Sequence, residues 1–314
     1  MSKGYAFSET FYSVQGEGFY TGVPSVWLRF FLCNLQCDGF GQEDPTNPET
    51  YELPYKDFDP IDVKNVTDLP VWEKGCDSSY SWSKKFKHLQ KKQTPEEIVE
   101  TLRREMVNAY NPDGDFNHPV SRASVHLVYT GGESLMKHAQ EAAVEINAVY
   151  KTKGNHERPW HTTWETNGTQ PLTEQFIRTF GNRGLYGGEL FFSCSPKLFT
   201  VSGEKPKKAI RPDIVSQYND LGMTVRERST TSRAPAGQLK FVLGPKPEQW
   251  EELDEVVHQF RQAGVDWPVW IMPVGATVEG QKLVDGDVAN MAQERGFNVS
   301  ARVHTYLWGN VIGV

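Results

Sequence analysis

The chain has 314 residues, of which 38% are hydrophobic, and it carries a formal net charge of −7 at pH 7. A chain of this length can bury enough apolar surface to fold without disulfides, and its acidic balance argues against a broad face that binds nucleic acid. It contains no run of about 18 apolar residues that would predict a membrane span, and residues 1–5 lack the apolar core of a signal peptide. We therefore expect a cytoplasmic protein that acts without nucleic acid or membrane.

Six short segments rich in β-branched and aromatic residues predict buried strands, each followed by a turn that contains Gly, Pro or Ser. They are residues 26–31, 125–130, 161–166, 189–194, 238–243 and 269–272. Helical patterns lie at residues 94–110, 135–150, 172–180, 247–263 and 287–295. Thr94 and Glu97 form a capping-box pattern with Pro95 at the first helical position, which marks the start of the first helix.

Strands that alternate with helices predict a parallel sheet with right-handed crossovers. We expect an α/β fold, a partial (β/α) barrel of about six parallel strands, in a single domain over residues 1–314. Residues 38–75 differ from the rest, because they are acidic and rich in proline and show little periodicity. We interpret them as an insertion, which is either functional or a solvated decoration.

Cys33, Cys37, Cys76 and Cys194 are the four cysteines. In a reducing compartment, clustered cysteines more often bind metal than form disulfides. The Cys33-x3-Cys37 pair follows the first predicted strand, and α/β barrels and open sheets bind ligands at the carboxyl ends of their strands. Taken alone, the pair could hold zinc, hold an iron–sulfur cluster, or consist of inert buried thiols.

Three other loops at the same predicted edge are rich in small and polar residues: 130–133, 165–168 and 195–197. Adjacent glycines expose backbone N–H and C=O groups, and helix N-termini favour negative groups, so these loops suit a charged cofactor. Ordinary turn chemistry is the alternative for each loop taken alone.

Ordered motifs over nearly the whole chain resemble those of the 7-carboxy-7-deazaguanine synthases, a family of radical S-adenosylmethionine enzymes. The motifs are FYSVQGEG at 11–18, Gly22-x-Pro24, Arg29, Cys33-x3-Cys37, CDSxYxW at 76–82, TGGE at 130–133, ETNGT at 165–169, SPK at 195–197, LKFV at 239–242 and RxHxxLWG at 302–309. The resemblance implies a carbon–nitrogen lyase that contracts the ring of 6-carboxy-5,6,7,8-tetrahydropterin to give 7-carboxy-7-deazaguanine and ammonia. It also implies a role in 7-deazapurine or queuosine biosynthesis, an external electron donor such as flavodoxin or ferredoxin, and a homodimer.

The family's cluster loop has the spacing Cys-x3-Cys-x2-Cys, whereas here Phe40 stands at the third position and Cys76 follows only after residues 38–75. Cys76 heads the segment that normally follows the third ligand. The resemblance therefore implies that Cys33, Cys37 and Cys76 bind a 4Fe–4S cluster, with Cys194 as the rival third ligand. Three thiolates leave one iron open to chelate S-adenosylmethionine, whose reductive cleavage yields the 5'-deoxyadenosyl radical.

The resemblance also implies the remaining site residues. S-adenosylmethionine would contact Gly75, Cys76, Asp77, Gly131, Gly132, Ser195, Pro196 and Lys197. The pterin would contact Val14, Gln15, Gly16, Glu17, Arg29 and Thr130. The Arg29 fork suits a carboxylate, although Arg also commonly forms structural ion pairs.

Two further expectations concern the segment around Cys76. Ser78 stands where the family uses a threonine hydroxyl to bind Mg²⁺, a metal that prefers oxygen ligands; a turn or helix cap is the alternative role for this serine. The family usually places an aromatic residue before the third cysteine to pack on adenine, whereas Lys74 and Gly75 precede Cys76. An insertion residue such as Trp72 could take that place.

Two other functions compete with this interpretation. A glycyl-radical activase would share the cluster but would have no evident use for the motifs at 15–18 and 302–309. A zinc-binding or nucleic-acid-interacting protein could use the four cysteines as a closed four-thiolate site. Substrate assay separates the first alternative, and metal analysis separates the second.

Overall fold

A nine-stranded sheet forms the centre of the computed structural model, which describes residues 3–181, 188–227 and 234–313. The strands are β1 (Tyr5–Val14), β2 (Pro24–Phe30), β3 (Lys91–Gln93), β4 (His126–Gly131), β5 (His161–Thr166), β6 (Glu189–Cys194), β7 (Gly237–Leu243), β8 (Val269–Pro273) and β9 (Asn298–Val299). Their order is β3-β1-β2-β4-β5-β6-β7-β8-β9, so the described sheet is open with β3 and β9 at its edges. β1 pairs antiparallel with β2 and β3, and all other pairings are parallel.

The α/β class is confirmed, and all six predicted strands are present as β2 and β4 to β8. The expected strand count was too low, because β1, β3 and β9 extend the sheet. β1 escapes sequence reasoning because Ser8, Glu9, Thr10 and Ser13 interrupt its apolar pattern, yet all four are buried. A strand that buries several polar residues does not show the hydrophobic run or alternation by which strands are recognised.

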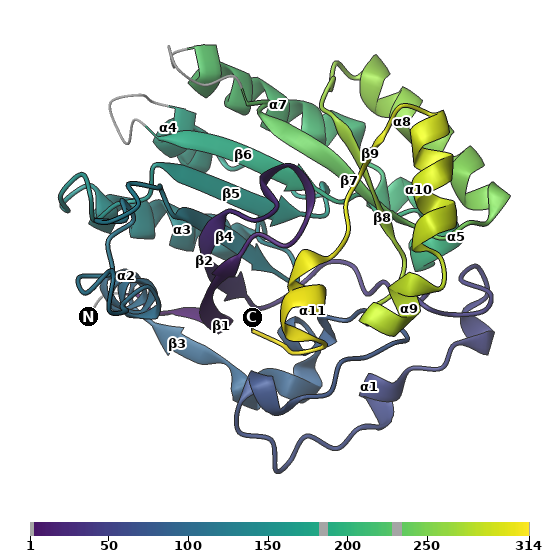
Figure 1. Ribbon diagram of the computed structural model, residues 1–314, viewed down its shortest axis with the longest axis horizontal. Helices are drawn as coiled ribbons and strands as arrows, with labels where there is room; N and C mark the ends of the chain where they lie inside the picture. The colour runs from purple at the N-terminus through teal and green to yellow at the C-terminus, as the bar shows by residue number, and fades with distance from the viewer. Residues whose placement is uncertain (1–2, 182–187, 228–233, 314) are drawn as a thin grey trace.

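The helices are α1 (Pro54–Asp57), α2 (Pro95–Glu105), α3 (Lys137–Tyr150), α4 (Glu174–Gly181), α5 (Phe199–Ser202), α6 (Pro206–Ala209), α7 (Pro212–Glu227), α8 (Pro247–Gln262), α9 (Val278–Lys282), α10 (Asp285–Glu294) and α11 (Val303–Trp308). The capping box is present, with the Glu97 amide donating to Thr94 Oγ1 at 3.3 Å and the Thr94 amide donating to the Glu97 carboxylate at 2.8 Å. The helix ends at Glu105 rather than near residue 110 because the Asn108 side chain accepts hydrogen bonds from the amides of the turn that follows. Helices α2, α3, α4, α7 and α8 contact one another in series along the sheet (Figure 1).

Aromatic side chains fill the layer between the sheet and these helices. The rings of Tyr129, Trp164 and Phe192 stack across β4, β5 and β6, with centroids 5.3 and 5.7 Å apart. Because successive side chains of a strand point to opposite faces, the next residues of β4 to β6 face away from the helices. The polar residues Thr130, Glu165 and Ser193 thereby reach the other face of the sheet.

Residues 38–90 contain little regular structure but have a hydrophobic cluster of their own. Its buried members are Tyr55, Val66, Leu69, Trp72, Tyr80, Phe86 and Leu89. Ile312, close to the C-terminus, packs against this cluster, and the C-terminal helix α11 lies near the N-terminal strand in Figure 1. The base of the 38–75 segment is closed by a 2.7 Å hydrogen bond from the Gly75 amide to the Phe40 carbonyl. This bond brings the chain after Gly75 back to the Cys37 loop.

Among the helices of the described residues, none is long and apolar enough to cross a bilayer.

Candidate active site

A cavity of about 290 Å³ lies at the carboxyl ends of the parallel strands, between the Cys33 loop and the C-terminal segment. Of the residues expected to bind cluster, cofactor, pterin or Mg²⁺, all but one line it: Val14, Gln15, Gly16, Glu17, Arg29, Cys33, Cys37, Gly75, Cys76, Asp77, Ser78, Thr130, Gly131, Gly132, Ser195 and Lys197. The exception is Pro196, which is buried beside Ser195 and Lys197 without lining the cavity. Nine of the ten motifs contribute residues to this one cavity. The parallel strands bring them together because their carboxyl ends lie at the same edge of the sheet.

Glu165 of β5 lies at the centre of the polar floor of this cavity. Its carboxylate accepts a hydrogen bond from Gln15 Nε2 at 3.2 Å and one from Thr130 Oγ1 at 3.4 Å. The ammonium group of Lys240 lies 4.0 Å from the same carboxylate. Two of the expected pterin contacts are therefore held in place by a carboxylate that was not assigned to the site.

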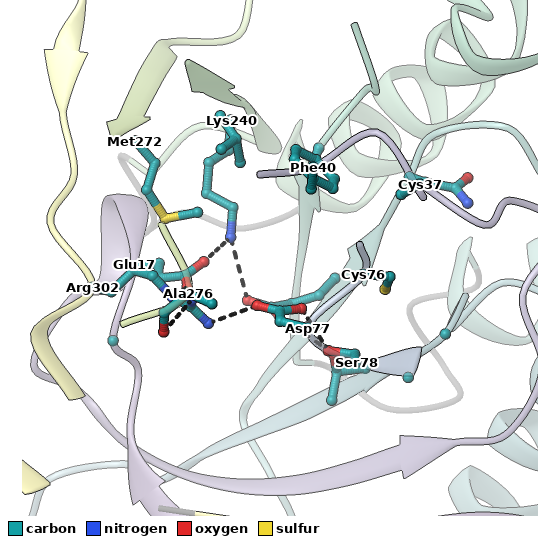
Figure 2. A pocket seen from close by; sticks show the side chains of 18 of the residues that line it. Glu17, Cys37, Phe40, Cys76, Asp77, Ser78, Lys240, Met272, Ala276 and Arg302 are labelled. Atoms are coloured by element: carbon teal, nitrogen blue, oxygen red, sulfur yellow. Dashed lines mark hydrogen bonds and ion pairs between the residues drawn. The ribbon is translucent and has the colours of Figure 1, made fainter. Parts of the chain in front are cut away.

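A chain of buried charges runs along one wall, and Figure 2 shows these side chains pointing toward one another. The Glu17 carboxylate pairs with Lys240 and, at 3.1 Å, with Arg302, and Arg302 also reaches Asp77 at 3.1 Å. Burial alone would raise the pKa of Glu17, but the charges of Lys240 and Arg302 outweigh it and hold that pKa well below its usual range. Burial likewise opposes ionisation of Asp77, and the Arg302 charge lowers its pKa on balance. Both carboxylates are thus ionised at neutral pH.

Arg29 is fixed by an ion pair behind the cavity wall. Its Nε donates to Glu9 Oε1 at 2.7 Å, and the Tyr80 hydroxyl donates to the same oxygen at 2.9 Å. The structural ion pair considered for Arg29 therefore exists, and it uses the Nε edge of the guanidinium. Arg29 still lines the cavity, so the pair with Glu9 orients its fork rather than removing it from the site.

The loop that carries Cys33 and Cys37 is held in a strained conformation at both ends. Leu32 has φ 87° and Cys37 has φ 56°, a left-handed region that costs non-glycine residues on the order of 1–3 kcal/mol. Hydrogen bonds hold each end, from the Leu32 amide to the Ser81 carbonyl at 2.9 Å and from the Cys37 amide to Glu204 Oε1 at 3.0 Å. Strain that persists in this way is characteristic of ligand-binding loops.

Gly132 is required by how closely its backbone passes this loop. A Cβ atom at that position would lie 2.5 Å from the Leu32 carbonyl oxygen and 2.8 Å from Cys33 Cβ. Gly16 passes close to a side chain at the opposite wall, where a Cβ would lie 1.9 Å from His304 Nδ1 and would displace that ring. Both glycines of the motif pattern therefore keep two segments of the site in direct contact.

The thiols of Cys33, Cys37 and Cys76 lie in one apolar pocket of the wall, packed with Leu35, Phe40 and Ala209. Burial raises the pKa of Cys33 to about 12 and that of Cys76 to about 11. The Leu35 amide donates to Cys33 Sγ at 3.4 Å, as does Asn167 Nδ2 at 3.8 Å. Thiols buried this way ionise only beside a strong positive charge, which a bound metal centre provides.

Cys194 lies elsewhere. It is fully buried in the main core and does not line the cavity. Across the described ranges, no three His, Cys, Asp or Glu side chains are arranged to hold one metal ion, and this applies to Cys33, Cys37 and Cys76 as well as to any set that includes Cys194. The four cysteines therefore do not form the closed four-thiolate site that a zinc-binding protein would need.

Two expectations around Cys76 meet different outcomes. Trp72 is buried in the cluster of residues 38–90 against Phe58 and does not line the cavity, so it does not pack on a ligand there. For Ser78 the alternative to Mg²⁺ binding, a side-chain cap, is absent: Ser78 precedes the 3-10 helix η4 (Ser79–Ser81), but its side chain makes no capping hydrogen bond. Its hydroxyl donates instead to Asp77 Oδ1 at 3.1 Å.

No ligand contact was expected of Lys240, Arg302, His304, Glu165 or Phe40, although the first four lie in the motifs that carry the resemblance, and all five line the cavity. Lys240 carried a second signal. Lys240 lies in the middle of the buried strand β7, and an unpaired lysine is almost never buried, so its position indicates a partner in the interior. The partners themselves come from parts of the chain that only the fold brings together.

Comparison with known proteins gives a consistent result. No family model matches the chain. The 7-carboxy-7-deazaguanine synthase of Rhodopirellula baltica is 26% identical over 306 residues, covering 96% of this chain and 86% of that protein. The protein of the same name from Halobacterium salinarum is 24% identical over 310 residues, covering 96% and 90%.

The comparisons also find a shorter match and a solved structure. A 7-carboxy-7-deazaguanine synthase of Bacteroides thetaiotaomicron is 60% identical over 30 residues, which are 10% of this chain. The crystal structure of QueE from Escherichia coli aligns with a TM-score of 0.48 and 18% identity, covering 96% of this chain and 95% of that one. The full-length sequence relatives confirm the resemblance on which the site expectations rest.

Proposed function

We propose that this chain, which belongs with the 7-carboxy-7-deazaguanine synthases, converts 6-carboxy-5,6,7,8-tetrahydropterin to 7-carboxy-7-deazaguanine and ammonia. The observation that carries this proposal is that one cavity is lined by three thiols along one wall and by the expected pterin-binding residues along the other. We further propose that β2 and β4 to β8 are the partial (β/α) barrel of a radical S-adenosylmethionine enzyme, in one domain with residues 38–75 as an insertion.

Cys33, Cys37 and Cys76 would hold a 4Fe–4S cluster. The fit rests on their shared apolar pocket, on the N–H donors aimed at Cys33 Sγ and on thiols that need a positive centre to ionise. When bound, this group with S-adenosylmethionine supplies the hydrogen-abstracting radical. The chain's own task is to orient the substrate and to exclude side reactions.

Gly131, Gly132, Ser195, Pro196 and Lys197 would border S-adenosylmethionine, together with Gly75, Cys76 and Asp77. Gly132 packs its backbone against Leu32 and Cys33, and Lys197 donates to Ser195 Oγ at 3.0 Å, so a glycine backbone and an ammonium group stand at the cysteine loop as donors for an anionic group of the cofactor.

Phe40 would take over the packing of adenine. Its carbonyl accepts from the Gly75 amide, so Phe40 stands beside Cys76 in space although the sequence separates them. Its ring lies in the cavity wall, 5.7 Å from the Lys197 ammonium group. The insertion thereby restores an aromatic neighbour for the third cysteine.

The pterin would lie over the polar floor of the cavity. Gln15, Glu17, Thr130 and Glu165 present acceptors and donors that suit the amide and guanidine-like edge of a pterin. Arg29, held from behind by Glu9, would receive the substrate carboxylate. Val14 and Gly16 would complete this wall through backbone contact.

Ser78 would bind Mg²⁺ together with oxygens of the substrate. Its hydroxyl is free of a capping role and lies beside the ionised Asp77. Mg²⁺ prefers hard oxygen ligands and keeps several waters, so a hydroxyl, a nearby carboxylate and substrate oxygens suit it. The metal would offset negative charge and fix the substrate for hydrogen abstraction.

The remaining proposals concern the setting of the enzyme. We propose a cytoplasmic location, supported by four cysteines that are all free, and an external electron donor of the flavodoxin or ferredoxin type. A homodimer is supported by a run of exposed apolar side chains near the C-terminus: Tyr306, Leu307, Trp308 and Val311. The product would enter 7-deazapurine biosynthesis, of which queuosine is one end point.

The test is anaerobic reconstitution with iron and sulfide, followed by incubation with the carboxy-tetrahydropterin, S-adenosylmethionine, Mg²⁺ and dithionite. Formation of 7-carboxy-7-deazaguanine is expected. Cofactor cleavage without that product would redirect the proposal to another radical enzyme, such as an activase.

A further inference from the structure

A second hollow lies behind the Cys33–Cys37 loop, on the outer side of the molecule. It has a volume of about 860 Å³, and we call it the basic groove after its five cationic lining residues, Lys56, Lys205, Lys207, Lys208 and Arg211. Asn34, Gln36 and Asp38 of the cysteine loop line the same groove. The basic groove and the active-site cavity therefore lie on opposite sides of the Cys33–Cys37 loop.

The charge of the groove is opposite to that of the chain. The chain has a net charge of −7, whereas the five cations of the groove face only two acidic lining residues, Asp38 and Glu204. Both acids are already paired, Asp38 with Lys56 at 3.1 Å and Glu204 with Lys208 at 3.4 Å. Lys205 and Lys207 are exposed at the rim. A positive patch on an acidic protein attracts an acidic partner, and like charges oppose the pairing of this patch with the same patch on a second copy.

The floor of the groove is joined directly to the cysteines. One oxygen of Glu204 accepts from the backbone amides of Gln36 at 2.6 Å and Cys37 at 3.0 Å. Ala209, which lies between Lys208 and Arg211 in the sequence, packs on Leu35 and Cys37. A partner bound in the groove would be separated from Cys37 by a single layer of protein, a short path for an electron.

We propose that the basic groove docks a small acidic one-electron carrier protein, and that electrons enter the site through the Cys33–Cys37 loop. This inference rests on the proposed function, because only a redox centre at the cysteines needs such a partner. The step transfers one electron from the reduced flavin or iron–sulfur centre of the carrier to the 4Fe–4S cluster. The carrier is oxidised by one electron, the cluster is reduced by one, and no bond or proton changes hands.

The variant K205E/K207E tests this proposal, because both lysines are exposed and neither lines the active-site cavity. The matched control is K91E/K92E, which makes the same charge change on the exposed lysines of the edge strand β3. The first measurement is stopped-flow reduction of the reconstituted cluster by a reduced flavodoxin. Bleaching of the cluster absorption monitors the reaction. No pterin is present, so this readout does not depend on the proposed reaction.

We expect K205E/K207E to lower the second-order rate of cluster reduction by flavodoxin about 10-fold or more at low salt, since steering by charge raises association rates by about 10- to 1,000-fold. The difference from the parent should shrink as salt is added. Reduction by dithionite should be unchanged, and the control should match the parent with both reductants. K205R/K207R, which keeps the charge, should restore the parent rate.

Other outcomes would overturn the inference. Equal slowing with flavodoxin and with dithionite would mean that the substitutions disturb the cluster itself. Unchanged reduction by flavodoxin, or equal slowing in the β3 control, would mean that the groove is not the docking site. The full assay tests the proposed function separately: a parent protein whose cluster is reduced normally but that forms no deazaguanine product would overturn the proposed function. In that case, titration of oxidised flavodoxin onto the parent and onto K205E/K207E would still measure docking at the groove.

Discussion

Nη2 of Arg302 lies 3.1 Å from Oδ2 of Asp77, and this ion pair ties the start of the C-terminal helix to the residue directly after Cys76. The same guanidinium reaches Glu17 with Nε at 3.1 Å, and its Nη1 donates to the carbonyl of Gly275 at 3.4 Å. One side chain thus joins the first loop of the chain, the Cys76 segment and the loop after β8. The walls of the cavity are held at fixed distances by this arrangement.

We predict that Arg302→Met destabilises the fold and loosens substrate binding. Removing one partner of a buried ion pair leaves the other charge uncompensated, which costs about 3 kcal/mol. The matched control is Arg178→Met, which breaks an exposed pair with Glu174 on α4 and should cost about 0–1 kcal/mol. The free energies of unfolding in urea, compared with the parent, test the difference. Equal losses in the two variants would show that Arg302 has no special structural role.

The cysteines give a second prediction. Cys33→Ala, Cys37→Ala and Cys76→Ala should each abolish the brown iron–sulfur absorption after reconstitution, because these thiols share one wall of the cavity. Cys194→Ala should keep both colour and activity, because that thiol lies in the main core beside Gly168. Iron and sulfide content per chain is the measurement. A colourless Cys194→Ala together with a coloured Cys76→Ala would reverse the assignment of the third ligand.

Phe40 provides the third prediction. Phe40→Leu should weaken binding of S-adenosylmethionine to the cluster-loaded protein about 10-fold, because stacking of a base on an aromatic ring is worth about 1–3 kcal/mol. Phe40→Tyr should retain affinity, and Trp72→Phe serves as the control since Trp72 does not line the cavity. Equilibrium dialysis measures the affinities. If Phe40→Leu binds as tightly as Phe40→Tyr, another residue contacts the adenine.

The buried histidine pair provides a prediction on pH. His126 is 5% exposed, and its ring stacks on His161 with centroids 4.4 Å apart. Burial, and to a lesser extent His161, lowers the pKa of His126 from 6.5 to about 3. Between about pH 6.5 and about pH 3, His126 is therefore protonated in the unfolded chain but neutral in the folded chain. The free energy of unfolding falls through that range as the pH decreases.

His126→Phe keeps a ring in this place and removes the titration. It should lose less stability than the parent between pH 7.5 and pH 5, by about 2 kcal/mol, since each unit of pKa shift corresponds to about 1.36 kcal/mol. Urea unfolding at the two pH values measures this difference. His258→Gln, at an exposed position on α8, should behave like the parent. Parallel acid losses in parent and His126→Phe would assign the acid sensitivity to other groups.

The sequence predicted the parallel part of the fold well, because the six buried strands and five of the helices carry their own periodicity. It did not predict β1, whose apolar pattern is interrupted by buried polar residues, or α7, although Ile214, Tyr218, Leu221 and Val225 recur there at helical spacing. The position of Pro95 and the capping box set the start of α2 locally, which explains why that boundary could be predicted.

The sequence named most residues that line the cavity but not the contacts that hold them there. The expected binding residues lie in short motifs, whereas the side chains that hold them come from distant parts of the chain. Glu17 and Lys240 are one example, and Arg29 and Glu9 are another. The displaced third cysteine is similar: closure by the hydrogen bond between Phe40 and Gly75 is set by the packing of residues 38–90, which has no short-range sequence signal.

In the proposed reaction, the cavity contracts a carboxylated tetrahydropterin with a radical generated at a cluster held by Cys33, Cys37 and Cys76. The most direct measurement incubates the reconstituted protein with 6-carboxy-5,6,7,8-tetrahydropterin, S-adenosylmethionine, Mg²⁺ and dithionite without oxygen, and follows product by mass. We expect 7-carboxy-7-deazaguanine from the parent and none from Cys76→Ala. A parent protein that holds a full cluster and cleaves S-adenosylmethionine but leaves the pterin unchanged would contradict it.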